Sequence, residues 1–364
     1  AEAWTAHYKN LLTSVAPGQQ LNSTEEWNNY FRSTINANTE LRVNEDLSWP
    51  EICATVTDMP AYKATGPTGM PVAWLQIACD KKVGGAVPAE PLSALGKVFF
   101  NICQRIWTGE QIPESLRTSF IVSIFKSGDK TLPTNYRGIS LVDSIMKVIA
   151  SIVSKRIQTA SQQRLSSFQA CFRPGEEGMG QGATLLEACQ RRSIHNMTTY
   201  VCFLDFQKAF DMVPHSILLY KLERFGVCGR ALQFFPTLYA SAQASVRDLA
   251  DGNNGEPFTP TRGVRQGCPS SPLMFNIFIN DLFDFCARFL KNNSINGSLT
   301  GLSQNADIHM FFPGLLFADD VVLCAESIAA LQKQLFAVEL LTRMNRMALN
   351  VNKCGVMAVN TNVA

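Results

Sequence analysis

The chain has 364 residues, of which 46% are hydrophobic and 17% are charged. This length is typical of about two folding units, and the composition excludes a fibrous chain and one that is disordered throughout. The net charge of +2 neither predicts nor excludes a nucleic-acid partner. The 11 cysteines include no CxxC pair, so we expect neither a disulfide framework nor a zinc site. The expected environment of the protein is a reducing compartment.

The first third of the chain reads as helices separated by turns. Residues 1–60 have amphipathic helical pieces, and residues 63–95 form a Gly- and Pro-rich connector around a short apolar segment, 72–77. Apolar residues recur at helical spacing from 95 to 107. None of these segments indicates a chemical role by itself.

The middle of the chain alternates short β-runs with helices. Residues 119–125 and 198–204 are predicted strands, and 142–156 is a predicted helix with a basic face. Residues 214–225 form a predicted helix that Gly226 closes in the left-handed conformation. No steady βαβ rhythm links these elements.

The last third predicts a hairpin over 242–264 around Asn253–Asn254–Gly255, followed by a helix from Ser271 to about Leu290. A surface loop at 291–305, a strand pair over 315–324 and a helix over 328–341 complete the pattern. The interleaving of strands and helices favours an α+β fold in which helices back an antiparallel sheet.

Three carboxylates stand at the ends of apolar β-runs: Asp205 ends VCFLD, and Asp319 and Asp320 interrupt LLFADDVVLC. Alone, Asp205 is a metal ligand, a helix cap or a satisfied structural acid, and the doublet fits an ordinary turn. At one sheet edge the three acids would repel one another unless divalent cations lay between them. Two such cations are what an in-line attack on a phosphoryl group requires.

Two further segments carry polar groups suited to nucleotides. Lys126 in IFKSGDK and Arg137 in NYRGISL flank a glycine-containing turn, where they form either a triphosphate clamp or a solvated charged loop. GVRQGCPSSP (263–272) precedes a predicted helix. Its glycines would let a base pair or sugar approach the backbone, and Gln266 could hydrogen bond to it; a plain loop with a helix cap is the alternative.

Seven motifs occur in an order that resembles the reverse transcriptase domain of the non-LTR (LINE-type) retrotransposon family. They are KATGPTG (63–69), IFKSGDK with NYRGISL (124–141), QACFRPG (169–175), FLDFQKAFD (203–211), GVRQGCPSSP (263–272), FADD (317–320) and LNVNKC (349–354). The resemblance implies a right-hand polymerase with an N-terminal helical extension (1–60), fingers (61–194) and palm (195–364). The palm sheet would be antiparallel and backed by helices, and the thumb would be largely absent.

The resemblance also implies an RNA-directed DNA polymerase that transfers a nucleotide from a dNTP to a primer 3′-hydroxyl by two-metal chemistry. Asp205, Asp319 and Asp320 would hold two Mg²⁺ ions, or Mn²⁺ in their place. Lys353 resembles a palm lysine that protonates the departing pyrophosphate, and a surface cation is the alternative.

Six residues match substrate-binding positions of the family: Lys126, Arg137, Phe206, Phe210, Gln266 and Gly267. The two cations match contacts to the triphosphate, and Gln266 with Gly267 matches the segment that lines the nascent base pair. Phe210 matches an aromatic gate against the nucleotide 2′-hydroxyl, with a palm-core aromatic as the alternative.

Departures from the usual motifs occur at Thr65, Thr68, Gly138, Cys171 and Ser270. Because the chain starts with Ala and stops soon after the last motif, we expect a fragment, with an endonuclease and a thumb on flanking sequence. A truncated, noncatalytic nucleic-acid-binding protein and an intron-encoded or telomerase-like polymerase stay open as alternatives.

The expected partners are an RNA template, a DNA primer or RNA–DNA hybrid, and dNTPs. No run of eighteen apolar residues occurs in the sequence, and no membrane partner is expected. The expected location is an intracellular ribonucleoprotein in the nucleus and cytoplasm.

Overall fold

The computed structural model describes residues 2–13, 40–81, 85–110, 112–239, 242–248, 252–292, 298–303 and 310–360. These residues form two compact units. The first contains the described residues of Ala1–Ser14, Ala37–Gln162 and Pro214–Met274, and the second those of Gln163–Val213 and Phe275–Ala364. Strands and helices are mixed in both units, which confirms the predicted α+β class.

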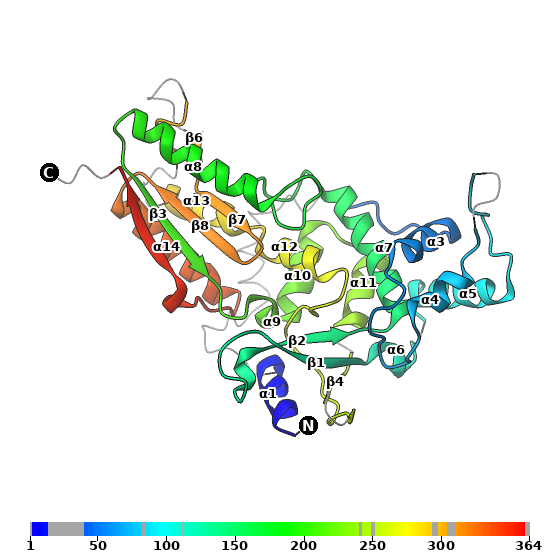
Figure 1. The fold of residues 1–364 in the computed structure, drawn as a ribbon. Coiled ribbons are helices and arrows are strands. Elements are labelled where there is room, and N and C mark those ends of the chain that lie inside the picture. The colour runs from blue at the N-terminus through cyan, green and yellow to red at the C-terminus, as the bar shows by residue number, and fades with distance from the viewer. Residues whose placement is uncertain are drawn as a thin grey trace. The chain divides into compact units, whose positions relative to one another are not determined.

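The first unit combines helices with a small mixed sheet (Figure 1). Its helices are α1 (Glu2–Thr13), α3 (Trp49–Asp58), α4 (Val72–Ala78), α5 (Ala94–Trp107), α6 (Glu114–Arg117), η1 (Pro133–Asn135), α7 (Ser144–Ser161), α10 (His215–Phe225) and α11 (Gly229–Leu238). The sheet order is β2 (Tyr136–Leu141), β1 (Ser119–Phe125), β4 (Ala244–Arg247). Strand β1 pairs antiparallel with β2 and parallel with β4.

Most elements predicted for this unit are confirmed within a few residues. Strand β1 covers the predicted range, and Gly226 ends α10 with a φ of 104°. The segment 72–77, predicted as part of a connector, is instead helix α4. Among the described residues of the predicted hairpin over 242–264, the arms pair through isolated bridges, Ala244↔Phe258 and Arg247↔Asn254, and β4 joins the sheet through β1.

The first turn of helix α7 is bonded to the loop of the KATGPTG motif. The Asp143 carboxylate accepts a hydrogen bond from the Ile145 N–H at 2.9 Å, which caps the helix. The other oxygen accepts from the Thr68 hydroxyl, and the Ser144 hydroxyl donates to the Met70 carbonyl at 2.6 Å. The KATGPTG loop is therefore fixed on the first turn of α7. Gly66 is required there, since a Cβ atom would lie 2.5 Å from the Asp143 nitrogen.

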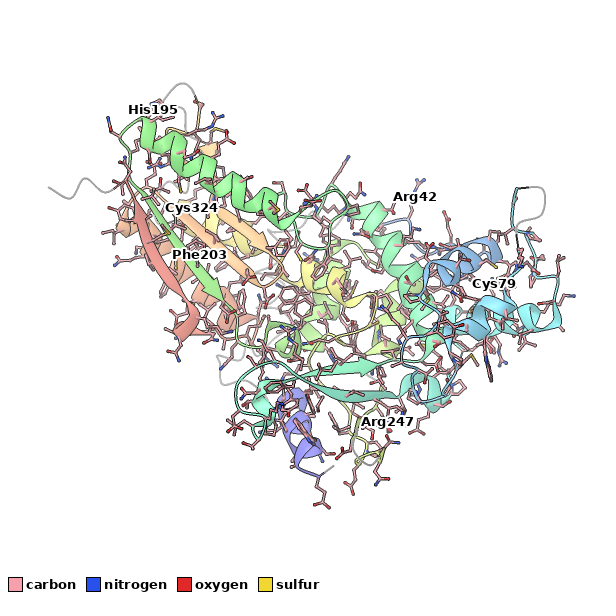
Figure 2. All side chains as sticks on the ribbon, in the orientation of Figure 1. Arg42, Cys79, His195, Phe203, Arg247 and Cys324 are labelled. Atoms are coloured by element: carbon pink, nitrogen blue, oxygen red, sulfur yellow. The ribbon has the colours of Figure 1, made fainter. Side chains whose placement is uncertain are left out.

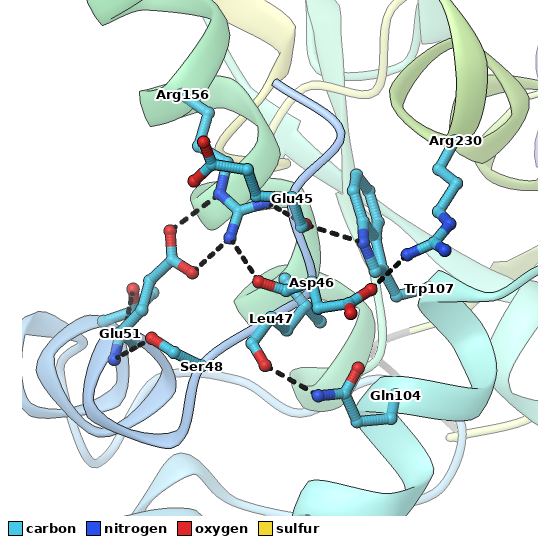
Figure 3. Close-up of polar contacts among 10 residues, drawn as sticks. Glu45, Asp46, Leu47, Ser48, Glu51, Gln104, Trp107, Arg156 and Arg230 are labelled. Carbon is cyan, nitrogen blue, oxygen red and sulfur yellow. Dashed lines mark hydrogen bonds and ion pairs between the residues drawn. The ribbon is translucent and has the colours of Figure 1, made fainter. Parts of the chain in front are cut away.

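Arg156 joins α7 to α3 and to the segment before it (Figure 3). Its guanidinium makes a bidentate ion pair with the Glu51 carboxylate, with N–O distances of 2.8 and 2.6 Å. It also donates to the main-chain carbonyls of Glu45 (2.6 Å) and Asp46 (3.0 Å). Because Trp107 donates to the same Glu45 carbonyl at 3.0 Å, the network also reaches the end of α5. Its donors are satisfied by the fold, which gives this network a structural role.

The second unit is built on a four-stranded antiparallel sheet in the order β7 (Gly314–Phe317), β8 (Asp320–Ala325), β3 (Thr199–Asp205), β9 (Gly355–Val359). A separate pair joins β5 (Ser298–Leu299) to β6 (Met310–Phe311). The helices are α8 (Gly178–Ile194), α9 (Ala209–Met212), α13 (Leu282–Asn292), α14 (Ile328–Met344) and η2 (Val351–Lys353), and α12 (Ser271–Ile279) runs across the boundary between the units.

The four-stranded sheet is covered unevenly. Helix α14 packs against β8 and β3. Cys324 on β8 is buried in an apolar cluster with Val201, Cys189 and Leu299 (Figure 2). Toward the carboxyl end of β3 the cover is incomplete, and Phe203 is 41% exposed (Figure 2). The end of the sheet that carries the acids is therefore accessible.

The predicted helix from Ser271 to about Leu290 is wrong as a single element. It is divided into α12 and α13, and Asn280 lies between them. The Asn280 side chain accepts from the Ser166 N–H at 2.7 Å and donates to the Arg164 carbonyl at 3.0 Å. An asparagine that bonds to another segment favours a helix end. Much of the predicted loop at 291–305 lies outside the described residues.

No helix in the described part of the chain combines the length and apolar character that a membrane crossing needs.

Candidate active site

The two strands at the centre of the second unit's sheet bring two of the predicted acids together. Strands β3 and β8 run antiparallel, and Asp205 is the direct partner of Asp320 in the register. Directly opposed residues of an antiparallel pair project to the same face with Cβ atoms about 5 Å apart. The two carboxylates thus lie side by side although 115 positions separate them in the chain.

Asp319 occupies the turn that joins β7 to β8. Phe317 pairs with Asp320, so the turn consists of Ala318 and Asp319. Ala318 has a φ of 54°, in the left-handed region that a non-glycine residue rarely adopts. The backbone therefore brings all three acids to one end of the sheet.

Among the described residues, no three His, Cys, Asp or Glu side chains form a ready-made metal cluster. The register pair of Asp205 and Asp320 is nevertheless a suitable donor set for Mg²⁺. This ion is usually bound by one or two carboxylates together with substrate phosphates and water. Asp205 and Asp320 fit the part of such a site that a protein supplies.

Lys353 lies next to this pair. Its Nζ atom is 3.6 Å from Oδ2 of Asp205, and the two side chains are 58% and 25% exposed. The main chain fixes this neighbourhood, because the Asn350 N–H donates to the Asp205 carbonyl at 2.8 Å. The ammonium therefore partly neutralises the carboxylate of Asp205. Whether it also acts as an acid stays a prediction.

Phe210 is the second residue of the short helix α9, and its ring contacts two other aromatic rings. It stacks on the buried Phe275 with ring centroids 4.5 Å apart, and meets Phe172 edge-on at 6.4 Å. These contacts hold the ring in one orientation, as a gate would need. Phe206, also predicted to bind substrate, has its ring buried and its backbone bridged to Leu349, and its role in substrate binding stays a prediction.

Cys171 lies close to the acidic turn. Burial raises the pKa of its thiol to about 11, and the negative charges of Asp319 and Asp320 add to the increase. The group is therefore a neutral thiol near pH 7.

In the first unit, the predicted hairpin of Lys126 and Arg137 is formed by β1 and β2. Arg137 pairs with Ile124, and the Lys126 N–H donates to the Asn135 carbonyl at 2.9 Å. Both cations are exposed, and within the described residues neither side chain has a hydrogen bond or ion pair. They are therefore available to an anionic ligand.

The GVRQGCPSSP loop lies against the same hairpin. The Ser140 N–H on β2 donates to the Gln266 carbonyl at 2.7 Å. Gly267 has a φ of 104°, and a Cβ atom there would be 3.0 Å from the Ser140 carbonyl oxygen. A glycine is therefore needed for this close approach. The structure brings Gln266 and Gly267 to the strand that carries Arg137.

Neither His215 nor Gln169 was predicted as a site residue from the sequence. The His215 Nε2–H donates to the Gly263 carbonyl at 2.9 Å. Burial, with the Arg265 cation nearby, lowers the pKa of His215 to about 4.

In the second unit, Gln169 contacts the turn residue Ala318 through its side chain. The QACFRPG motif locates Gln169, but nothing in the local sequence indicates which backbone it contacts.

Comparison with known proteins identifies the relatives of this chain. Residues 124–363 match the family described as reverse transcriptase (RNA-dependent DNA polymerase). The transposon TX1 uncharacterized 149 kDa protein of Xenopus laevis is 24% identical, covering 80% of this chain and 20% of that protein. The Pol polyprotein of the type-2 retrotransposable element R2DM of Drosophila melanogaster is 28% identical, covering 70% and 22%. These matches confirm the predicted resemblance.

The chain spans about a fifth of the length of these two relatives. Among solved structures, apo telomerase from Candida tropicalis truncated from its C-terminal domain gives a TM-score of 0.49 at 11% identity, covering 70% of this chain and 52% of the other.

Proposed function

Because the chain belongs to the reverse transcriptase family, we propose that it is an RNA-directed DNA polymerase domain of a non-LTR retrotransposon. It joins a dNTP to a primer 3′-hydroxyl on an RNA template. The proposal includes fingers within residues 61–194, a palm within 195–364, and a location in a ribonucleoprotein of the nucleus and cytoplasm. The observation that carries it is the register pair of Asp205 and Asp320 beside the turn of Asp319.

The carboxylates have a defined task in this proposal. Asp205 and Asp320, with Asp319 beside them, hold two Mg²⁺ ions, or Mn²⁺ in their place. When bound, such ions increase the nucleophilicity of a hydroxyl and stabilise charge on the phosphates. The chain's own contribution is to keep the two carboxylates in one place on rigid strands before the substrate arrives, since positioning lowers the barrier without any later reorganisation.

The remaining residues act on the substrates. Lys126 and Arg137 bind the triphosphate, the arginine as a planar fork and the lysine as a point charge. Gln266 and Gly267 line the nascent base pair. Phe210 excludes the 2′-hydroxyl of ribonucleotides by its size. Lys353 contacts Asp205 and supplies a proton to the departing pyrophosphate.

Primer extension tests the proposal. The protein should extend oligo(dT) on poly(rA) with dTTP and Mg²⁺, and Asp319→Ala should lower the rate by at least about 100-fold. Glu339→Gln is the matched control, because this carboxylate is on α14 of the same unit and, within the described part of the chain, pairs with Arg343 alone on the surface. Extension that survives Asp319→Ala would refute the assignment. Binding of the hybrid without extension would favour the noncatalytic alternative.

A further inference from the structure

Gln169 has an unusual set of contacts for a loop glutamine. Its side chain is buried, with 1% of the residue exposed. The Oε1 atom accepts from the Ala318 N–H at 3.1 Å, and the Nε2 group donates to the Ala318 carbonyl at 3.3 Å. The carboxamide thus bonds both polar groups of one residue, the residue that immediately precedes Asp319.

The main chain around Gln169 supports the same contact. The Leu316 N–H donates to the Phe168 carbonyl at 2.8 Å, and the Ala170 N–H donates to the Leu316 carbonyl at 3.2 Å. These bonds form a short parallel bridge along the edge of β7. The Gln169 carboxamide extends this bridge to Ala318, the first residue after β7. It takes the place of the main-chain hydrogen bonds that a further residue pair would make there.

Ala318 needs such a partner because its backbone is strained. A non-glycine residue at a φ of 54° is disfavoured and persists only where its surroundings hold it. The carboxamide satisfies the two buried polar groups of this residue in that conformation. Without it, the turn would lose two hydrogen bonds and could relax toward a commoner backbone conformation, which would move Asp319 and Asp320.

The segment that carries Gln169 is itself anchored to α12 and to Asn280, which follows this helix. The Asn276 side chain donates to the Cys171 carbonyl at 2.7 Å, and Asn280 bonds both Arg164 and Ser166. The Oε1 atom of Gln169 also accepts from the Cys171 N–H at 3.0 Å. Gln169 is therefore held from its own side before it contacts the turn, as a fixed support must be.

We propose that Gln169 is a positioning residue that fixes the Ala318–Asp319 turn and so sets the placement of the metal-binding carboxylates. It acts through the backbone of Ala318 and not on the substrate. This inference rests on the proposed function for its catalytic consequence, whereas the contact with the turn is independent of that function.

Two variants and one control separate positioning from packing. Gln169→Met keeps the length of the side chain and removes both hydrogen-bonding groups. Gln169→Glu keeps an acceptor for the Ala318 N–H but places a second oxygen against the Ala318 carbonyl. Gln334→Met is the matched control, because Gln334 is equally buried and donates to a carbonyl of β8 at its far end, that of Cys324, at 3.1 Å.

The first measurement is hydrogen exchange of a peptide that spans 315–322, without nucleic acid or metal. Gln169→Met should speed exchange in this peptide by about tenfold, while Gln334→Met should leave the turn unchanged. Equal exchange in wild type and Gln169→Met would overturn the proposed contact, whether or not the protein is a polymerase.

The second measurement is primer extension on poly(rA)–oligo(dT) across a Mg²⁺ titration. Both Gln169 variants should lower the maximal rate by about 10- to 100-fold and raise the half-saturating Mg²⁺ concentration, with hybrid binding within about twofold of wild type. A wild-type rate and Mg²⁺ dependence in Gln169→Met would overturn the positioning role and leave the polymerase assignment intact. A wild-type protein that extends nothing would refute the assignment instead, and the exchange data would still decide the contact.

Discussion

Lys353 Nζ lies 3.6 Å from Asp205 Oδ2, so a cation already occupies one side of a predicted metal-binding carboxylate. A bound ammonium and a divalent cation compete for the same negative charge. The effect should be modest because the pair is partly exposed to solvent.

We therefore expect Lys353→Met to lower the half-saturating Mg²⁺ concentration for primer extension by about two- to fivefold. Lys333→Met removes an equal charge from an exposed position of α14 and should leave the Mg²⁺ dependence unchanged. A Mg²⁺ requirement that rises in Lys353→Met would contradict competition. A fall in maximal rate would support the proposed proton donor role.

The packing of Phe210 predicts a change in sugar selection. Stacked on Phe275, the ring occupies a fixed volume, and Phe210→Ala should empty it. The ratio of efficiencies for rUTP over dTTP should rise by about 10- to 100-fold, while Phe210→Tyr, which keeps the ring, should stay near wild type. Both nucleotides are measured on the same protein, so a general loss of activity cancels. An unaltered ratio in Phe210→Ala would refute the gate.

Gly66 predicts a large loss of stability from a single methyl group. A Cβ atom would meet main-chain atoms of Val142 and Asp143 at 2.7 and 2.5 Å, and backbone at the start of α7 cannot easily move away. Gly66→Ala should lower the free energy of unfolding by about 2 kcal/mol or more. Gly182→Ala, inside α8 with no atom within 4 Å, should raise it by about 0.5–1 kcal/mol. Urea unfolding of both variants measures the contrast.

Arg156 predicts a stability effect that an exposed ion pair does not have. Arg156→Met would remove the hydrogen bonds that the guanidinium donates to Glu51, Glu45 and Asp46, which should cost about 2–4 kcal/mol. Arg105→Met breaks an ion pair whose side chains are 65% and 49% exposed and should cost less than about 1 kcal/mol. Thermal unfolding distinguishes the two, and similar losses would show that the network is not what stabilises this region.

His215 predicts a loss of stability in acid. Burial, opposed by the hydrogen bond to Gly263, holds its pKa at about 4, below the ordinary value of 6.5. Between these values the unfolded chain binds a proton that the folded chain does not, so stability falls as pH drops from 6.5 to 4. The contribution is about 3 kcal/mol at most.

In His215→Gln this part of the pH dependence should disappear. The difference in unfolding free energy between wild type and variant should thus shrink from pH 7 to pH 4.5, as followed by urea titration at each pH. A constant difference would mean that His215 is not neutral in the fold.

The local sequence was sufficient to predict several elements of the fold and the types of residue at the candidate site. The β-run over 119–125, the cap at Gly226 and the strand pair around FADD depend on short-range periodicity and backbone preference, and each is found where predicted. The helix over 271–290 was wrong because its division depends on Asn280, whose side chain bonds a segment 114 and 116 positions away.

The sequence by itself determined that Asp205, Asp319 and Asp320 lie at the ends of apolar β-runs and that Lys126 and Arg137 flank a turn, because these features lie within a few consecutive residues. Only the tertiary structure decided that Asp205 opposes Asp320, that Lys353 contacts Asp205, and that Gln169 bonds Ala318 across 149 positions. Strand register and side-chain partners depend on how the entire chain packs, and no local preference encodes that arrangement.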